Sequence, residues 1–324
     1  MPKLNLKFFF IKFLLISNLS FRIVGKLIFQ DNFDTLDANV WLHESLNEAH
    51  LDEFQLYTDT KENSYSEHGI LHIKPTLVVN EESDKFHPIR SARLSTKNSF
   101  SFTYGIIEFR ARIPSGDWLF PALWLMPTNS QYGPWPTSGE IDVMESRGNR
   151  NLTDTQGNFV GVQQVSSTLH WGPRTDLDGW KLSHFSNNDN SCFSNAFHTY
   201  KTIWTPESIS FHVDEEQIGI TVPPEGGYWE MGDFNKDDLP NPWSNGTKSA
   251  PFDQSFYLII NLAVGGTHFF SDADNNEGGK PWKNTSPNAG LDFWKGRDQW
   301  LGTWNLATDD SHFLIDYVRV WDLE

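Results

Sequence analysis

Short runs of alternating apolar and polar residues recur along this chain and restrict it to a fold made of β-strands. Residues 105–113 alternate over the length of a full strand and stop at Pro114. Because side chains of a strand point alternately to its two faces, this run predicts a strand with one buried face. Residues 256–264 are apolar on both faces, which predicts a central strand. Further runs of this kind lie at 69–74, 208–214, 218–220 and 313–321.

The segments between these runs are rich in Gly, Pro, Asn and Asp, and helical periodicity is almost absent. Residues 214–217 are the expected turn of one hairpin. Three longer polar segments are expected to be loops, at 175–195, 228–253 and 271–300. Such loops on a rigid sheet usually shape a binding surface, and disorder of parts of them is the alternative. Short strands with such spacing predict an all-β fold, a β-sandwich.

Composition narrows the classes of partner. The chain has 324 residues, enough for one large all-β domain or two small ones, and a formal net charge of −17. That charge argues against nucleic-acid binding, which needs basic surfaces, whereas a neutral polysaccharide tolerates it. The 14 Trp residues fit a carbohydrate cleft, because indole faces stack on sugar rings. A large core with additional surface Trp explains the same number.

Residues 1–25 are expected to be a secretory signal peptide, followed by one domain over 26–324. A basic start precedes the apolar run 8–16, which Lys12 interrupts and which is too short to span a bilayer. Cleavage is expected after Gly25 or Ser20, and a buried N-terminal strand is the alternative. No other segment is long and apolar enough for a membrane span. The sequence therefore predicts secretion.

Two further features agree with secretion. The single cysteine, Cys192, excludes an intrachain disulfide, and a large domain is stable without one. Three Asn-x-Ser/Thr triplets are predicted glycosylation sites, at Asn151, Asn245 and Asn284.

Three carboxylates, Glu140, Asp142 and Glu145, stand within six residues of a segment that otherwise has the pattern of a buried strand. Like charges so close repel each other and resist burial, so folding alone gives no reason for them. Paired carboxylates with unlike pKa values are what cleavage of a glycosidic bond requires. An exposed acidic strand face is the alternative.

The spacing of these acids predicts a local irregularity. Glu140 and Asp142 share a strand face, whereas strict alternation puts Glu145 on the other face. One extra residue near Val143 and Met144, a β-bulge, would return Glu145 to the same side and bend the strand. Bending shortens the roughly 16 Å that five straight steps would span, toward the ~5–5.5 Å carboxylate separation of a retaining glycosidase.

This segment resembles the Glu-x-Asp-x-x-Glu signature of glycoside hydrolase family 16, laminarinase type. Similarity extends over roughly residues 28–324 and includes the stretches 104–112, 121–127, 169–172, 261–266 and 316–321. Within the family, the chain resembles animal β-1,3-glucanases and β-1,3-glucan recognition proteins, also called Gram-negative bacteria-binding proteins. The resemblance implies a curved, concanavalin-like jelly-roll sandwich with the substrate cleft on its concave face.

The resemblance also implies roles for single residues. Glu140 would be the nucleophile and Glu145 the acid/base, with Asp142 assisting. Trp135 matches a position that stacks on a sugar ring. Four more residues match positions that bind sugar hydroxyls or lie near the acid/base: Arg93, Glu108, Arg110 and His170.

Some of these matches have structural alternatives. Glu108 and Arg110 could be a same-face structural pair, and His170 a satisfied core histidine. Trp124 is expected in the core rather than in the cleft. Asp316 matches an aspartate that helps to bind a structural calcium in family members, and no other cofactor is implied.

The resulting hypothesis is a secreted, monomeric endo-β-1,3-glucanase that retains configuration. The alternative is a recognition protein of innate immunity that binds β-1,3-glucan without cutting it, and a structural matrix protein is a third hypothesis. Non-catalytic relatives typically lack one or more of the three acids, whereas this chain has all of them. The domain follows the expected signal directly, without the additional N-terminal glucan-binding module of many recognition proteins.

Overall fold

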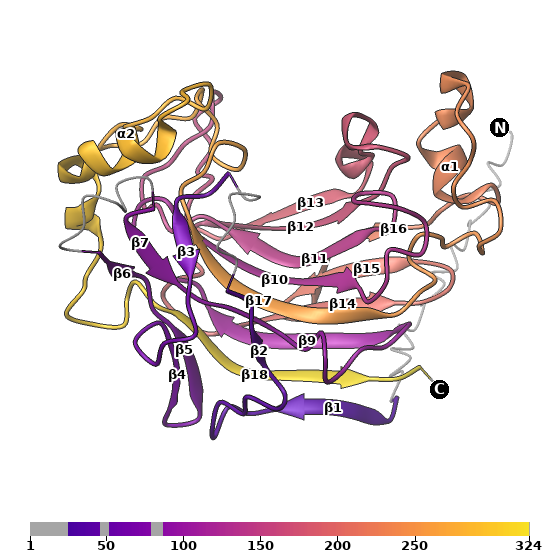
Figure 1. The fold of residues 1–324 in the computed structure, drawn as a ribbon, viewed down its shortest axis with the longest axis horizontal. Coiled ribbons are helices and arrows are strands. Elements are labelled where there is room, and N and C mark those ends of the chain that lie inside the picture. Colours follow the sequence, from indigo (N-terminus) through magenta and orange to yellow (C-terminus); the bar gives the residue numbers. More distant parts are fainter. Residues whose placement is uncertain (1–24, 46–51, 79–86, 324) are drawn as a thin grey trace, which may run out of the picture.

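Two antiparallel β-sheets stack on each other in the computed structural model, which describes residues 25–45, 52–78 and 87–323 (Figure 1). The acid-bearing sheet, named for the carboxylates of β11, has the strand order β13 (His184–Asn188), β12 (Gln164–His170), β11 (Glu140–Ser146), β10 (Leu119–Pro127), β17 (Phe256–Val264), β8 (Arg93–Ser95) and β2 (Leu42–His43). The opposite sheet has the order β16 (Glu216–Thr221), β15 (Ile209–Val213), β14 (His198–Trp204), β9 (Gly105–Arg112), β18 (Phe313–Trp321), β5 (Ile70–Ile73) and β4 (Ser64–Glu67), with β1 (Leu27–Asp31) also beside β18. These layers confirm the predicted curved β-sandwich.

Smaller elements complete the fold. A third sheet has the order β3 (Gln55–Tyr57), β7 (Ile89–Ser91) and β6 (Thr76–Leu77). The helices are α1 (Gly227–Met231), α2 (Ala289–Lys295) and the 3₁₀ turns η2 (Thr175–Leu177), η3 (Trp180–Leu182), η4 (Phe234–Asp237), η5 (Arg297–Gln299) and η6 (Leu301–Thr303). None of the helices within the described ranges is long and apolar enough to cross a membrane.

The core lies between the two sheets. Alternate residues of the acid-bearing sheet, such as Leu123 and Ile141, are fully buried, as are Ile107 and Phe109 of the opposite sheet. The predicted central strand is confirmed, because β17 pairs with β10 on one side and β8 on the other and all nine of its residues are buried. Such burial explains why its sequence is apolar on both faces.

Two sequence expectations about connections need correction. The hairpin turn consists of Asp214 and Glu215 alone, both with positive φ (48° and 70°), since β16 already begins at Glu216. The segment 175–195 is not only loop, because it contains β13. This strand was missed because it is an edge strand with a single apolar residue, Phe185, and no buried residue.

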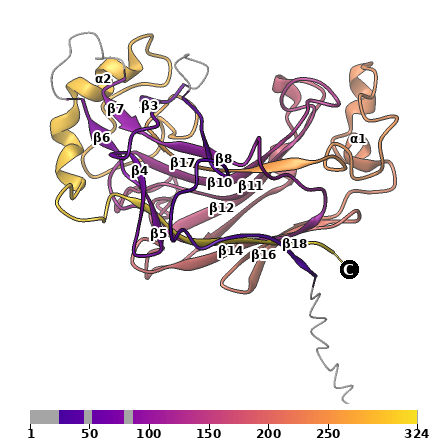
Figure 2. The same ribbon diagram turned by 60° about the horizontal axis from the view of Figure 1, so that its bottom comes forward.

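Most of the tryptophans belong to the core, which corrects the emphasis on a carbohydrate cleft. Nine of the 14 are buried. One aromatic cluster joins Trp171 to Tyr228 of α1 and to Trp243, and another joins Trp282 to Phe293 of α2. In both views α1 and α2 lie at opposite ends of the sandwich (Figures 1 and 2). These clusters therefore anchor the loops at the two ends of the acid-bearing sheet.

The predicted signal peptide, residues 1–25, lies outside the described residues except for Gly25. Gly25 is buried against the backbone of Asp322, directly after β18. The prediction of a signal and of its cleavage site stays a prediction.

Candidate active site

Strand β11 presents all three carboxylates on the outer face of the acid-bearing sheet. In its pairing with β12, each acid has a cross-strand partner: Glu140 pairs with His170, Asp142 with Thr168, and Glu145 with Ser166. Three steps along β11 from Asp142 to Glu145 match two steps on β12, so β11 contains one extra residue at Val143 and Met144. The predicted β-bulge is confirmed, and it returns Glu145 to the face of Glu140 and Asp142.

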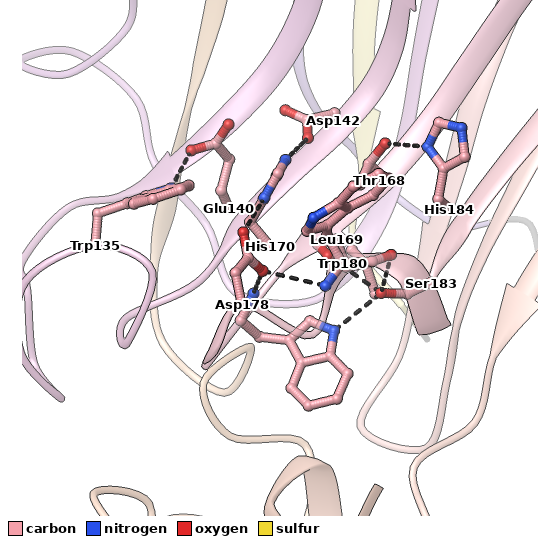
Figure 3. Close-up of polar contacts among 11 residues, drawn as sticks. Trp135, Glu140, Asp142, Thr168, Leu169, His170, Asp178, Trp180, Ser183 and His184 are labelled. Carbon is pink, nitrogen blue, oxygen red and sulfur yellow. Dashed lines mark hydrogen bonds and ion pairs between the residues drawn. The ribbon is translucent and has the colours of Figure 1, made fainter. Parts of the chain in front are cut away.

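Glu140 is held by a neighbouring tryptophan. The indole Nε1–H of Trp135 donates a hydrogen bond to Glu140 Oε2 at 2.7 Å, which leaves the other carboxylate oxygen free of this contact (Figure 3). The Trp135 ring is 41% exposed, and its centroid lies 5.5 Å from that of the His170 imidazole. This position suits a ring that stacks on a sugar beside the acids.

Asp142 lies between the two glutamates and is almost completely buried. Burial, together with the negative charges of Glu140 and Glu145, raises the pKa of Asp142 well above its usual range. The shift favours the protonated form of Asp142. In that form Asp142 can donate a hydrogen bond to Glu140 and does not add a further negative charge.

Glu145 has the properties of a general acid. Burial and the charge of Glu140 raise the pKa of Glu145, whereas His170, Arg147 and a hydrogen bond from Thr168 lower it, and the balance is a pKa of about 7. A carboxyl group with a pKa near the working pH can donate a proton in one step and accept one in the next.

His170 forms the polar link between the acids and a loop (Figure 3). Its Nε2 lies 3.4 Å from Asp142 Oδ2, and its Nδ1–H donates to Asp178 Oδ2 at 2.6 Å. Burial alone would lower the pKa of His170, but the hydrogen bond to Asp178 and the surrounding negative charges raise it to about 9. The imidazolium is therefore favoured, and it offsets part of the negative charge of the acids.

Two supporting contacts were not found from the sequence. Asp178 is fixed by the backbone N–H groups of Trp171 and Trp180, at 3.2 and 3.1 Å, and so orients the His170 ring. His184 of β13 lies with its Nδ1 2.9 Å from the Thr168 hydroxyl. No spacing rule connects Asp178 or His184 to the β11 motif, because loop conformation and strand pairing bring them there.

Thr168→Val tests how the hydroxyl tunes Glu145. A hydroxyl has one proton, so Thr168 donates to Glu145 when it accepts from His184 Nδ1–H. Without this hydrogen bond, worth about 1 kcal/mol, the pKa of Glu145 should rise by about 0.7 units. We expect the titration of the Glu145 carboxyl group, followed by NMR of the carbon-13-labelled side chain, to move to higher pH in Thr168→Val and to return in Thr168→Ser. A shift to lower pH would contradict the contact.

The family model for glycosyl hydrolases family 16 matches residues 50–226, which is more than half of the chain and includes β11 with its three carboxylates. The chain belongs to glycosyl hydrolases family 16.

Relatives in the family are similar over most of the chain. A beta-1,3-glucan-binding protein of Penaeus monodon is 40% identical, with 92% of this chain and 90% of that protein covered. A beta-1,3-glucan-binding protein of Tenebrio molitor is 32% identical over 91% of this chain but only 65% of its own length. The laminarinase of Rhodothermus marinus has a similar structure, with a TM-score of 0.63, 27% identity, and 93% of this chain and 98% of that chain covered. With 65% of its length covered, the Tenebrio protein is matched by this chain over less than two thirds of its length.

Among the other residues predicted from the family 16 resemblance, Arg93 lies in the acid-bearing sheet. It pairs in register with Asn261, on the face that also carries Asp142. Its Nε forms an ion pair with Glu44 at 2.8 Å, and its guanidinium lies 4.6 Å above the Trp124 ring. Trp124 is therefore not a core residue as expected, but lies partly exposed on the outer face. A role of Arg93 in binding sugar hydroxyls stays a prediction.

Glu108 and Arg110 are not brought to the acids, which corrects their assignment to the family 16 cleft. Both lie on β9 of the opposite sheet and point away from the core. Glu108 accepts a hydrogen bond from the Tyr317 hydroxyl at 2.9 Å, and Arg110 forms an ion pair with Asp316. Each has its own structural partner, because β9 joins the sheet on the far side of the sandwich.

The contact of Asp316 also bears on the expected calcium. Its carboxylate already faces the guanidinium of Arg110, so a cation neutralises it without a metal ion. The side chains around Asp316 therefore do not fit the calcium ligand that the resemblance implies.

The three predicted glycosylation sites differ in accessibility. Asn151 and Asn245 are exposed. Asn284 is half-buried, and its amide Nδ2 donates to the backbone oxygen of Phe270 at 2.8 Å. Glycosylation at all three sites stays a prediction.

Proposed function

We propose that this protein is an endo-β-1,3-glucanase that hydrolyses laminarin-like β-1,3-glucan with retention of configuration. The observation that carries this proposal is the bulge in β11, which places Glu140, Asp142 and Glu145 on one face in unlike electrostatic surroundings. The name of the Penaeus relative supports the glucan, and the Rhodothermus laminarinase supports its hydrolysis.

In the first step, the free oxygen of Glu140 attacks the anomeric carbon of the sugar beside Trp135. The glycosidic C–O bond breaks, and the leaving oxygen takes the proton of Glu145. The products are a glycosyl ester on Glu140 and a shortened glucan chain. The raised pKa of Asp142 and the positive charge of the His170 imidazolium both reduce the negative charge that faces Glu140 before this attack.

In the second step, the ionised Glu145 removes a proton from water, which attacks the same anomeric carbon. The ester bond breaks, Glu140 leaves as a carboxylate, and Glu145 is again protonated. Two inversions at one carbon retain its configuration. The pKa of about 7 at Glu145 suits both halves of the cycle.

The second candidate is a glucan-binding protein of innate immunity that does not cut its ligand, which the names of the Penaeus and Tenebrio relatives favour. Both candidates agree with a secreted monomer that binds polysaccharide through the outer face of the acid-bearing sheet. They differ only in whether the acids act chemically.

Incubation of the purified protein with laminarin separates the two candidates. An endo-glucanase should release new reducing ends together with a rapid fall in glucan chain length. Binding of laminarin without any new reducing ends would overturn the enzymatic proposal and leave the recognition protein.

A further inference from the structure

Three side chains of the acid cluster converge on one point. One oxygen each of Glu140 and Asp142 and one ring nitrogen of His170 lie within 4.8 Å of one another. In the part of the chain that the structure describes, this is the one group of three His, Cys, Asp or Glu side chains so arranged. Once the proton on His170 Nε2 and any proton on Asp142 are lost, the set offers one imidazole nitrogen and two carboxylate oxygens, so a bound metal ion has to displace these protons.

A buried carboxylate oxygen points into this cluster. Asp142 is only 2% exposed, and its Oδ2 makes no hydrogen bond. This oxygen has its contact with His170 Nε2, at 3.4 Å. Two ligands of a tetrahedral zinc ion, each bound at about 2.0–2.1 Å, are separated by about 3.4 Å. Asp142 and His170 therefore already have the separation of a zinc-ligand pair.

The surroundings of His170 match those of a zinc-bound histidine. Its Nδ1–H donates to Asp178 at 2.6 Å, so Nε2 is the nitrogen that faces the cluster (Figure 3). Zinc-bound histidines usually donate their second N–H to a carboxylate in this way. Glu140 is partly exposed, and one of its carboxylate oxygens completes the set as a third ligand.

We propose that Glu140, Asp142 and His170 form a zinc-binding site, in which Zn²⁺ takes three protein ligands and leaves a fourth position open to water. A mixed nitrogen and carboxylate set suits Zn²⁺ better than Ca²⁺ or Mg²⁺, which prefer six or more oxygen ligands. Zinc would occupy the nucleophile and so inhibit hydrolysis. This inhibition rests on the proposed function, whereas zinc binding does not.

Isothermal titration of the metal-free, full-length protein with zinc chloride tests the site without any assay of activity. We expect one Zn²⁺ per chain in the wild type, with no comparable binding of Ca²⁺ or Mg²⁺. His170→Asn and Glu140→Gln should each abolish this binding. Asp178→Asn should weaken it by about 10–100-fold, because the imidazole loses its carboxylate partner. Asp176→Asn is the matched control, since it removes the same charge from an exposed position of the same loop.

Cobalt(II) provides a second measurement should a His170 variant fail to fold. Bound in this site of the wild type, Co²⁺ should show the strong visible absorption of tetrahedral coordination, and Zn²⁺ should displace it. Zinc binding that His170→Asn and Glu140→Gln leave unchanged, or no saturable binding by the folded wild type, would overturn the site. A protein that binds zinc but does not cleave laminarin would contradict the proposed function alone, and one that cleaves laminarin without binding zinc would contradict the zinc site alone.

Discussion

Glu140→Gln should abolish hydrolysis of laminarin, with a loss in kcat of about 10⁴-fold or more, because an amide cannot form the glycosyl ester. The amide oxygen can still accept the hydrogen bond that Trp135 Nε1–H donates to Glu140 in the wild type. The fold and glucan binding should therefore be retained. Reducing-end release measures turnover, and laminarin affinity electrophoresis measures binding.

Glu225→Gln is the matched control for this variant, because it removes the same charge from a side chain that is 96% exposed. It should hydrolyse laminarin like the wild type. Activity in Glu140→Gln above a small fraction of the wild-type rate would show that another residue is the nucleophile. Circular dichroism shows whether Glu140→Gln is folded. If this variant does not fold, Glu140→Ala is a second variant for the same test.

Glu145→Ala should lower kcat/KM for laminarin by about 10²–10⁴-fold, because the leaving sugar oxygen no longer receives a proton. A gluco-oligosaccharide with a nitrophenyl leaving group needs no such proton. Its first step, seen as a burst of nitrophenol, should be far less affected. The basic limb of the pH profile should disappear, because the group with a pKa of about 7 has been removed.

Azide provides the control for this interpretation. As a small anionic nucleophile that needs no general base, it should restore turnover of the nitrophenyl substrate by Glu145→Ala and release a glycosyl azide of retained configuration. Equal losses for laminarin and for the nitrophenyl burst, with no azide effect, would contradict the acid/base role of Glu145.

The sequence predicted the strands and the bulge because both depend on local alternation. Residues 105–113 became β9 and residues 256–264 became β17, since each pattern records which faces of a strand are buried. Strict alternation puts Glu145 on the other face, so the bulge followed from the spacing of the three acids together with the requirement of glycoside cleavage that they share a face. By contrast, β13 has one apolar residue, Phe185, and no buried one, so it leaves no such pattern.

The sequence by itself thus determined that Glu140 and Asp142 share a strand face, and with the expected chemistry it predicted a bulge between Asp142 and Glu145. Only the tertiary structure decided that Asp178 reaches His170, and that Arg110 faces Asp316 across the sandwich from the acids. The alternation of apolar and polar residues predicts that a side chain points away from the core, but it does not predict which sheet the strand joins. That choice depends on the pairing of segments far apart in the chain, such as β9 with β18 and β11 with β12.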